Sequence, residues 1–187
     1  MVKELIASGI EILTVISTAL IGLLLLLFIL KFVFRKDTDL YKDIVHFLQD
    51  HYLIIGFIVS LVATLGSLFY SDIMGYNPCK LCWYQRIFMY PQVILFGIAL
   101  KTKRKSIIAN SMWLSGFGFL IAAYHYLIQI GVMTGGCDVV GYSAKCSEFF
   151  SLAYGFVTIP FMALIAFAIL LIIGYGKLRD CKARGVR

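Results

Sequence analysis

Charged residues are scarce in this chain. Only 14% of its 187 residues are charged, whereas 61% are hydrophobic. A water-soluble fold of this length needs more polar surface than this composition supplies, which excludes a soluble globular domain. The sequence also lacks low-complexity tracts and any repeat with a period of about 20 to 50 residues, which excludes a repeat architecture. We therefore expect a protein embedded in a lipid bilayer.

Long apolar segments dominate what is present. A helix needs about 20 such residues to cross a bilayer, at about 1.5 Å of rise per residue. The segments that meet this length are 5–30, 52–70, 83–100, 107–132 and 149–175. The last four are joined by short connections, which make successive helices antiparallel neighbours. The expected fold is all-α, an antiparallel four-helix transmembrane bundle with one extra N-terminal transmembrane helix.

The expected organisation has four parts: an N-terminal transmembrane helix (1–34), a polar linker (35–50), a four-helix core (51–176) and a basic tail (177–187). The first segment is longer than the apolar part of a signal peptide, and no small-residue cleavage site follows it, so we expect it to be retained. Apolar residues recur at helical spacing in the linker, which indicates either an interfacial amphipathic helix or a solvated connection.

The net charge of +7 predicts orientation rather than nucleic-acid binding, because the basic residues stand in short clusters between apolar segments. With Lys31 at the end of the first span, the 35–50 linker, the 101–105 run and the tail in the cytoplasm, that side holds thirteen Lys and Arg. The other side then holds four, namely Lys3, Lys80, Arg86 and Lys145. Basic residues accumulate on the cytoplasmic side of membrane proteins, so the N-terminus is predicted outside and the C-terminus in the cytoplasm.

Cysteines follow the predicted sidedness. Cys79 and Cys82 lie in the first outer loop, Cys137 and Cys146 lie in the second, and Cys181 stands alone in the cytoplasmic tail. Paired thiols on the oxidising side are typical of disulfides. The alternatives are two structural disulfides, a redox pair or a zinc site. Zinc is disfavoured because eight residues separate the second pair and neither loop contains histidine, so we expect no metal.

The segment NPCKLCWYQR at 77–86 favours redox chemistry. A disulfide between Cys79 and Cys82 closes a small ring and stabilises little, so its value lies in reactivity. Pro78 is suited to a helix start, where backbone N–H groups lower the pKa of a thiol. Arg86 follows on the same helix face, one turn deeper, beside a thiolate or among the headgroups.

Two cysteine pairs on one side indicate an electron relay by thiol–disulfide exchange. The final acceptor must be more oxidising than glutathione and reachable from the bilayer, and a lipid quinone meets both conditions. His125 and Gln129 share a helix face and could present two hydrogen-bonding groups to a quinone carbonyl, or join helices. Gln85 is a further candidate for contact with the ring.

Three motifs carry a family resemblance: NPCKLCWYQR followed by MYP, YHYLIQ at 124–129, and TIPFMALIAF at 158–167. Together they resemble the disulfide bond formation protein B (DsbB) family, most closely its short BdbC-type members, over about residues 50–176. The resemblance implies an enzyme of the bacterial inner membrane, with redox loops on the extracytoplasmic side. Such a thiol:quinone oxidoreductase reoxidises a DsbA-like, thioredoxin-like dithiol oxidase and passes electrons to a lipid quinone, ubiquinone or menaquinone.

The resemblance also implies a role for each outer cysteine. Cys79 and Cys82 would communicate with the quinone, with the Cys82 sulfur next to the ring. Cys137 would form the mixed disulfide with the soluble partner, and Cys146 would exchange with Cys79. The loop between Cys137 and Cys146 is shorter here than in Gram-negative family members, so the reach between the two pairs is expected to differ.

Arg86 would be the electrostatic partner of the quinone, and His125 matches a family histidine associated with it. Two rival functions remain at this point. A quinone reductase of the vitamin K epoxide reductase type also pairs a membrane CxxC with a quinone, but WYQR after the cysteines fits it poorly. A non-catalytic membrane scaffold with structural disulfides predicts that Cys82→Ser leaves the oxidation of secreted proteins unchanged.

Overall fold

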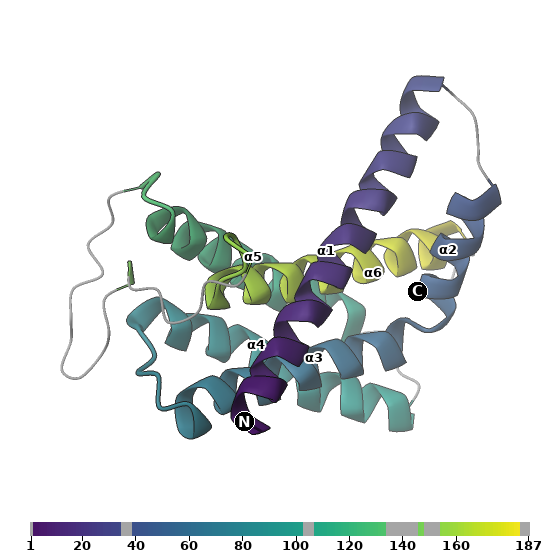
Figure 1. Ribbon diagram of the computed structural model, residues 1–187. Helices are drawn as coiled ribbons and strands as arrows, with labels where there is room; N and C mark the ends of the chain where they lie inside the picture. Colours follow the sequence, from purple (N-terminus) through teal and green to yellow (C-terminus); the bar gives the residue numbers. More distant parts are fainter. Residues whose placement is uncertain (1, 35–38, 103–106, 134–145, 148–153, 184–187) are drawn as a thin grey trace.

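The computed structural model describes residues 2–34, 39–102, 107–133, 146–147 and 154–183. Helices make up nearly all of these residues (Figure 1). In chain order they are α1 (Val2–Phe34), α2 (Asp39–Asp50), α3 (Tyr52–Leu68), the π-helical turn η1 (Phe69–Ile73), α4 (Lys80–Thr102), α5 (Ile107–Gln129) and α6 (Ile159–Ala183). This confirms the all-α prediction.

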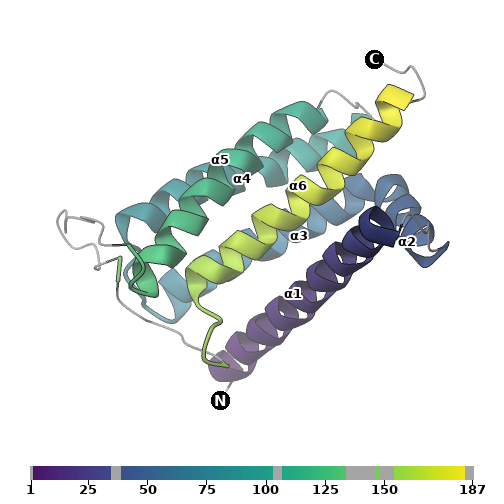
Figure 2. The same cartoon turned by 90° about the horizontal axis from the view of Figure 1, so that it is seen from above.

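Helices α3 to α6 form a bundle around one apolar core, and α1 and α2 pack on its outside (Figure 2). Two glycines allow the close approach of neighbouring helices. A methyl group at Gly56 of α3 would collide with the Phe96 ring of α4, and one at Gly118 of α5 would collide with the Phe167 ring of α6. Both rings are buried in the core, so these contacts fix the spacing of the bundle.

Four helical segments of the described chain are long and apolar enough to cross a membrane: Val2–Leu23, Tyr52–Ile73, Ile107–Gln129 and Ile159–Arg179. The chain is a helical membrane protein. The third predicted span falls in α4, which is long enough but too polar to be among these segments. Its polar residues are partly internal: the buried Gln92 amide oxygen accepts hydrogen bonds from Ser111 (2.8 Å) and Ser115 (3.1 Å) of α5. The membrane crossing by α4 stays a prediction.

The start predicted for the last span, residue 149, is wrong, because residues 154–158 precede α6 in a turn and are not helical. Tyr154 and Gly155 have positive φ angles of 52° and 78°, which are incompatible with a continuing helix. The Thr158 hydroxyl then accepts a hydrogen bond from the Phe161 amide at 3.4 Å and caps α6. Pro160 lies in the first turn, where a missing N–H group costs nothing.

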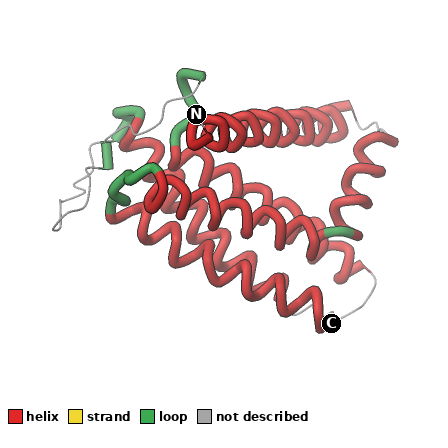
Figure 3. The backbone as a smooth tube through the Cα atoms, turned by 60° about the horizontal axis from the view of Figure 1, so that its bottom comes forward, coloured by secondary structure: helices red, strands yellow, loops and turns green. Residues whose placement is uncertain are grey.

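The N-terminus and the C-terminus lie at opposite ends of the bundle (Figure 3), and two hydrogen bonds show which helices meet at each end. The Lys3 ammonium donates to the Ile73 carbonyl at 3.0 Å, which places the start of α1 at the end where α4 begins. The Gln49 amide donates to the Gly176 carbonyl at 3.1 Å, which places α2 beside the C-terminal part of α6, at the other end. The N-terminus and the first cysteine loop thus share one end, as predicted. Which end faces outside stays a prediction.

Candidate active site

The first cysteine pair lies where α4 begins. Pro78 precedes the helix, and the Cys79 carbonyl accepts a hydrogen bond from the Trp83 amide at 3.2 Å, so Cys79 is the N-cap residue. The Cys79 sulfur accepts a hydrogen bond from the Cys82 amide at 3.4 Å, in the way that a capping side chain does. The two sulfur atoms lie 3.2 Å apart, and both thiols are free. The predicted helix start at the cysteines is confirmed.

Several hydrogen-bond donors surround the Cys79 sulfur, just outside α4. The hydrogen bond from the Cys82 thiol lowers the pKa of the Cys79 thiol to about 4, although burial raises it. Hydrogen bonds from His125 and from the Cys82 amide lower the pKa further. Cys79 is 2% exposed. A thiolate at this N-cap is therefore stabilised in a dry environment.

His125 joins α5 to this pair. Its Nε2 atom lies 3.5 Å from the Cys79 sulfur and 3.2 Å from the carbonyl oxygen of Cys146, and its Nδ1 atom lies 3.1 Å from the Gln85 amide nitrogen. Because the Gln85 amide donates to Nδ1, the ring proton lies on Nε2 and points to both the sulfur and the carbonyl. Gln85 thus orients His125. Contact of either residue with a quinone stays a prediction.

Cys146 lies beside the first pair. Its sulfur is within 4.8 Å of the Cys79 sulfur, and it packs with Cys79 and Ile128 in a small buried cluster. Cys146 is disulfide-bonded, and neither Cys79 nor Cys82 is its partner, because both are free. Cys137 lies outside the described residues. One member of each cysteine pair therefore lies beside one member of the other, near the start of α4 and the end of α5.

Cys79, His125 and Cys146 also have the spacing of metal ligands, since their sulfur and nitrogen atoms all lie within 4.8 Å of one another. Zinc binds cysteine as the thiolate, and the sulfur of Cys146 is held in a disulfide in this structure. The sequence argument against zinc rested on the absence of histidine from the loops, and it missed that α5 supplies one. The expectation of no metal stays a prediction.

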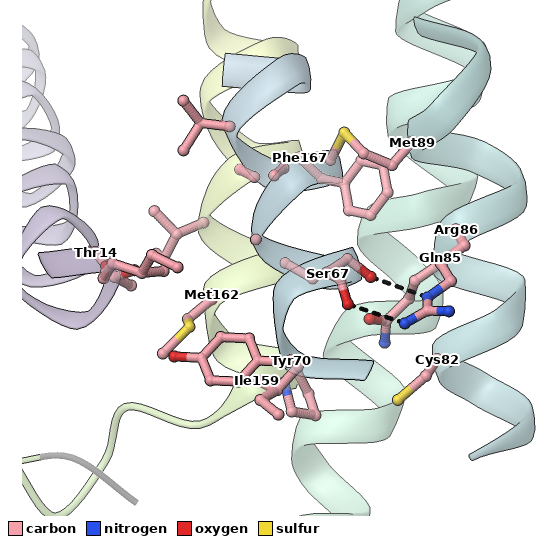
Figure 4. Close-up of a pocket in the computed structure, with 18 of the residues that line it drawn as sticks. Thr14, Ser67, Tyr70, Cys82, Gln85, Arg86, Met89, Ile159, Met162 and Phe167 are labelled. Carbon is pink, nitrogen blue, oxygen red and sulfur yellow. Dashed lines mark hydrogen bonds between the residues drawn. The ribbon is translucent and has the colours of Figure 1, made fainter. Parts of the chain in front are cut away.

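Arg86 lies one turn below Cys82 and is held by α3. Its Nε and Nη2 groups donate to the hydroxyl and carbonyl oxygens of Ser67 at 2.9 and 3.0 Å, and its guanidinium lies 5.0 Å from the Trp83 ring centroid (Figure 4). Arg86 is thus oriented inward instead of extending to the headgroups. Ser67 uses two of its five N–H donors, which leaves three to serve a ligand. No sequence pattern marks Ser67 as this partner.

A cavity of about 270 Å³ adjoins these groups. Its wall includes both cysteines of the first pair and all four residues predicted to bind a cofactor, namely Arg86, His125, Gln85 and Gln129. The rest of the lining is mostly apolar and comes from α1, α3, η1, the segment 76–78, α4 and α6. The structure therefore brings the first cysteine pair and the four predicted cofactor-binding residues together around one largely apolar space.

Tyr70, in η1, lines the same cavity and was not predicted as a site residue. Its side chain is 5% exposed, and its buried hydroxyl has no hydrogen-bond partner among the described residues. A buried hydroxyl without a partner is costly, so one is expected where a ligand supplies the acceptor. In the sequence Tyr70 was only the end of an apolar segment. The π-helical turn that carries it cannot be predicted from composition, and such turns are frequent at functional sites.

The chain is similar to a family of known proteins. Residues 49–175 match the family described as "Disulfide bond formation protein DsbB". A "Probable disulfide formation protein" of Oceanobacillus iheyensis is 38% identical over 132 residues, which are 70% of this chain and 91% of that protein. A "Probable disulfide formation protein C" of Bacillus cereus is 43% identical over 119 residues, 64% of this chain and 86% of that protein. The "Disulfide bond formation protein C" of Bacillus subtilis is 39% identical over 121 residues, 65% and 88% of the two chains. No solved structure matches.

Proposed function

Because this chain belongs to the DsbB family of disulfide bond formation proteins, we propose that it is a membrane thiol:quinone oxidoreductase. It reoxidises an extracytoplasmic, DsbA-like dithiol oxidase and passes two electrons to a lipid quinone, which sustains disulfide formation in exported proteins. The position of the Cys79 sulfur carries this proposal. It lies 3.2 Å from the Cys82 sulfur and within 4.8 Å of the Cys146 sulfur, at the edge of an apolar cavity.

The first exchange takes electrons from the soluble partner. A thiolate of the reduced partner attacks the Cys137 sulfur of a Cys137–Cys146 disulfide, and the Cys146 thiolate leaves. The second thiol of the partner then attacks the mixed disulfide and releases Cys137. The partner has lost two electrons and two protons, and the second cysteine pair has gained them.

The second exchange takes these electrons to the cavity. The Cys146 thiolate attacks the Cys79 sulfur of an oxidised Cys79–Cys82 pair, and Cys137 resolves the resulting Cys79–Cys146 bond, which leaves the first pair reduced. The Nε2 proton of His125 faces both the Cys79 sulfur and the Cys146 backbone. It therefore holds the two cysteines together and stabilises negative charge on the sulfur.

The cavity residues fit a quinone ring. When bound, a quinone supplies the sink for two electrons and two protons. The cavity volume of about 270 Å³ is close to the lower end of the roughly 300–1,000 Å³ typical of ligand pockets. Arg86 and the Tyr70 hydroxyl would donate hydrogen bonds to the two ring oxygens, and Cys82 presents its sulfur to the same space. The apolar lining excludes water. Ubiquinone and menaquinone both suit this donor set.

The proposed location is the bacterial inner membrane, with both cysteine loops on the extracytoplasmic side. Its support is the distribution of Lys and Arg, together with the shared end of the N-terminus and the first cysteine loop. Opposite accessibility of Lys80 and Lys101 to an impermeant amine reagent in intact cells would test it. Labelling of Lys101 but not Lys80 would contradict it.

Quinone consumption by the purified protein tests the reaction. Given a reduced thioredoxin-like dithiol, the protein should reduce one quinone for each disulfide formed. Cys82→Ser should abolish this turnover, whereas Cys181→Ser, at the far end of α6, should keep it. A non-catalytic scaffold predicts no quinone reduction by the unaltered protein and no effect of Cys82→Ser on the oxidation of exported proteins.

A further inference from the structure

Helix α1 lies outside the family match, which begins at residue 49, yet it forms part of the cavity wall. The α1 residues that line the cavity are Ile10, Leu13, Thr14 and Ser17. Their spacing of three and four residues places them on one face of the helix. This α1 face, defined by these residues, is a wall that the family's four-helix core does not supply.

The α1 face packs against the bundle. Thr14, at the centre of the α1 face, is only 7% exposed, whereas Leu13 of the same face is 47% exposed, and Ile12 and Ile16, on the other side of α1, are 47% and 59% exposed. Ile10 faces Gly66 of α3, where an added methyl group would lie 3.7 Å from the Ile10 Cδ1 atom. Together with the hydrogen bond from Lys3 to Ile73, these contacts hold the N-terminal half of α1 against α3.

Small side chains leave room between α3 and α6. Ala63 and Gly66 of α3 and Ala163 and Ala166 of α6 line the cavity here, where larger residues would close it. Figure 4 shows the order across this space: Cys82 and Arg86 at one end, then Ser67, then Tyr70 and Met162, and Thr14 of α1 at the other end.

The two ends of the cavity differ in chemistry. The end at α4 carries the cysteines, Arg86 and the amide side chains, whereas the end at α1 is lined by aliphatic side chains and by the hydroxyl residues Thr14 and Ser17. The Thr14 hydroxyl donates a hydrogen bond within its own helix, to the Ile10 carbonyl at 2.9 Å, so it needs no acceptor from a ligand. A molecule that fills this space has a polar head at the sulfurs and a hydrocarbon part at α1.

We propose that the α1 face binds the isoprenoid tail of the quinone whose ring occupies the cavity beside Cys82. This inference rests on the proposed function and adds to it that the tail, and not only the ring, is recognised. With α1 in place, the first part of the tail packs against protein side chains instead of lipid chains, and these van der Waals contacts add to its affinity. The protein should therefore prefer a tailed quinone to the same ring without a tail.

Thr14→Trp tests this, because the indole would fill the α1 end of the cavity. The matched control is Ile16→Trp, which adds a similar side chain on the exposed side of α1. The probes are a quinone with a multi-unit isoprenoid tail and the same ring carrying a methyl group instead. The readouts are the shift in Tm that each probe gives the full-length protein in nanodiscs, and the apparent KM for each.

We expect the unaltered protein and Ile16→Trp to show a larger Tm shift with the tailed quinone. Thr14→Trp should lose this excess and raise the KM for the tailed quinone about tenfold, with no change for the tailless ring. An unchanged preference in Thr14→Trp would overturn the inference. If the unaltered protein neither binds nor reduces either quinone, the proposed function itself fails. If the protein binds both quinones equally well, the inference about the tail fails but the proposed function stands.

Photolabelling of the unaltered protein gives an answer even if Thr14→Trp does not fold. A quinone with a photoreactive group in the first part of its tail should label the α1 peptide that contains residues 10–17. An excess of tailed quinone should compete this label away, and a phospholipid should not. Labelling confined to α3–α6 would show that the quinone tail does not occupy the α1 face. Labelling of α1 that phospholipid removes would show that a bilayer lipid occupies it instead. Either result would overturn the inference.

Discussion

The Nε2 atom of His125 lies 3.5 Å from the sulfur of Cys79, across a separation of 46 residues in the sequence. The same nitrogen lies 3.2 Å from the Cys146 carbonyl. Both helices that carry this contact belong to the bundle, so the packing of α5 against the start of α4 sets the meeting point of the two cysteine pairs. The meeting point of the two pairs therefore does not depend on the length of the second loop. This is compatible with the short spacing between Cys137 and Cys146.

His125→Ala should slow electron transfer between the two pairs by about ten- to a hundredfold, since a hydrogen bond to a charged group contributes about 1.5–3 kcal/mol. The measurement is single-turnover transfer from a pre-reduced second pair to an oxidised Cys79–Cys82 pair, without quinone. Gln85→Ala removes only the hydrogen bond that orients the His125 ring, so it should slow the transfer less. If His125→Ala changes the KM for quinone alone, its role lies at the quinone and not at the sulfurs.

Arg86→Ala should raise the apparent KM for quinone by about tenfold or more, because the cavity loses its only cation among the described lining residues. Ser67→Ala is the control. It keeps the charge and the carbonyl acceptor at 3.0 Å and removes only the hydroxyl acceptor, so a several-fold smaller rise is expected. Equal effects of the two variants would mean that the orientation of Arg86 matters more than its charge.

The thiolate of Cys79 should persist far below the ordinary pKa of a thiol. Because its pKa is lowered to about 4, the charged form is present above that pH and is lost as the pH falls through it. With Cys137, Cys146 and Cys181 replaced by serine, the thiolate ultraviolet absorbance of the reduced protein should therefore stay constant from about pH 9 to about pH 6, the range over which an ordinary thiol loses its charge. The low pKa depends on a donor at residue 82.

Two variants at residue 82 separate this cause from burial. Cys82→Ser keeps a hydroxyl donor and should keep the thiolate at pH 6, whereas Cys82→Ala removes the largest stabilising contact and should move the pKa back toward its ordinary value. The absorbance titration of each variant measures this. If Cys79 is still a thiolate at pH 6 in Cys82→Ala, the helix start and His125 are sufficient to lower the pKa of its thiol.

Tyr70→Phe should have opposite effects on stability and on binding. In the ligand-free protein it removes a buried hydroxyl that has no partner in the described part of the chain, so the free energy of unfolding should stay equal or rise by up to about 1 kcal/mol. Quinone affinity should fall several-fold, for tailed and tailless rings alike. A loss of stability in the ligand-free protein would mean that the hydroxyl already has a structural partner. Thermal unfolding with and without quinone measures both effects.

Local features of the site were predictable from the sequence. Within one or two helical turns, spacing alone determines which side chains are neighbours. This was enough to predict the helix start after Pro78, the closeness of Cys79 and Cys82, and the position of Arg86 one turn later. The two glutamines of α4 were not distinguishable in this way. Gln85 faces His125 at the site, whereas Gln92 accepts hydrogen bonds from Ser111 and Ser115 in the core. Their difference depends on which residues of α5 lie opposite.

The start of α6 shows a second limit. Apolar composition continues from residue 149 into α6, so a prediction from hydropathy extends the helix too far. The backbone departs from helical geometry at Tyr154 and Gly155, and the helix begins only after Thr158. Hydropathy measures the free energy of transfer into lipid and is insensitive to backbone conformation.

The sequence by itself determined that this chain enters a membrane as helices, that its paired cysteines stand near helix ends, and that one pair adjoins a cation. These properties follow from composition and from spacings shorter than one or two helical turns. Only the tertiary structure decided that His125 meets Cys79 and Cys146, that Ser67 holds Arg86, and that α1 closes the cavity. Each of these is a contact between helices, and it depends on how their faces pack, which no single helix contains.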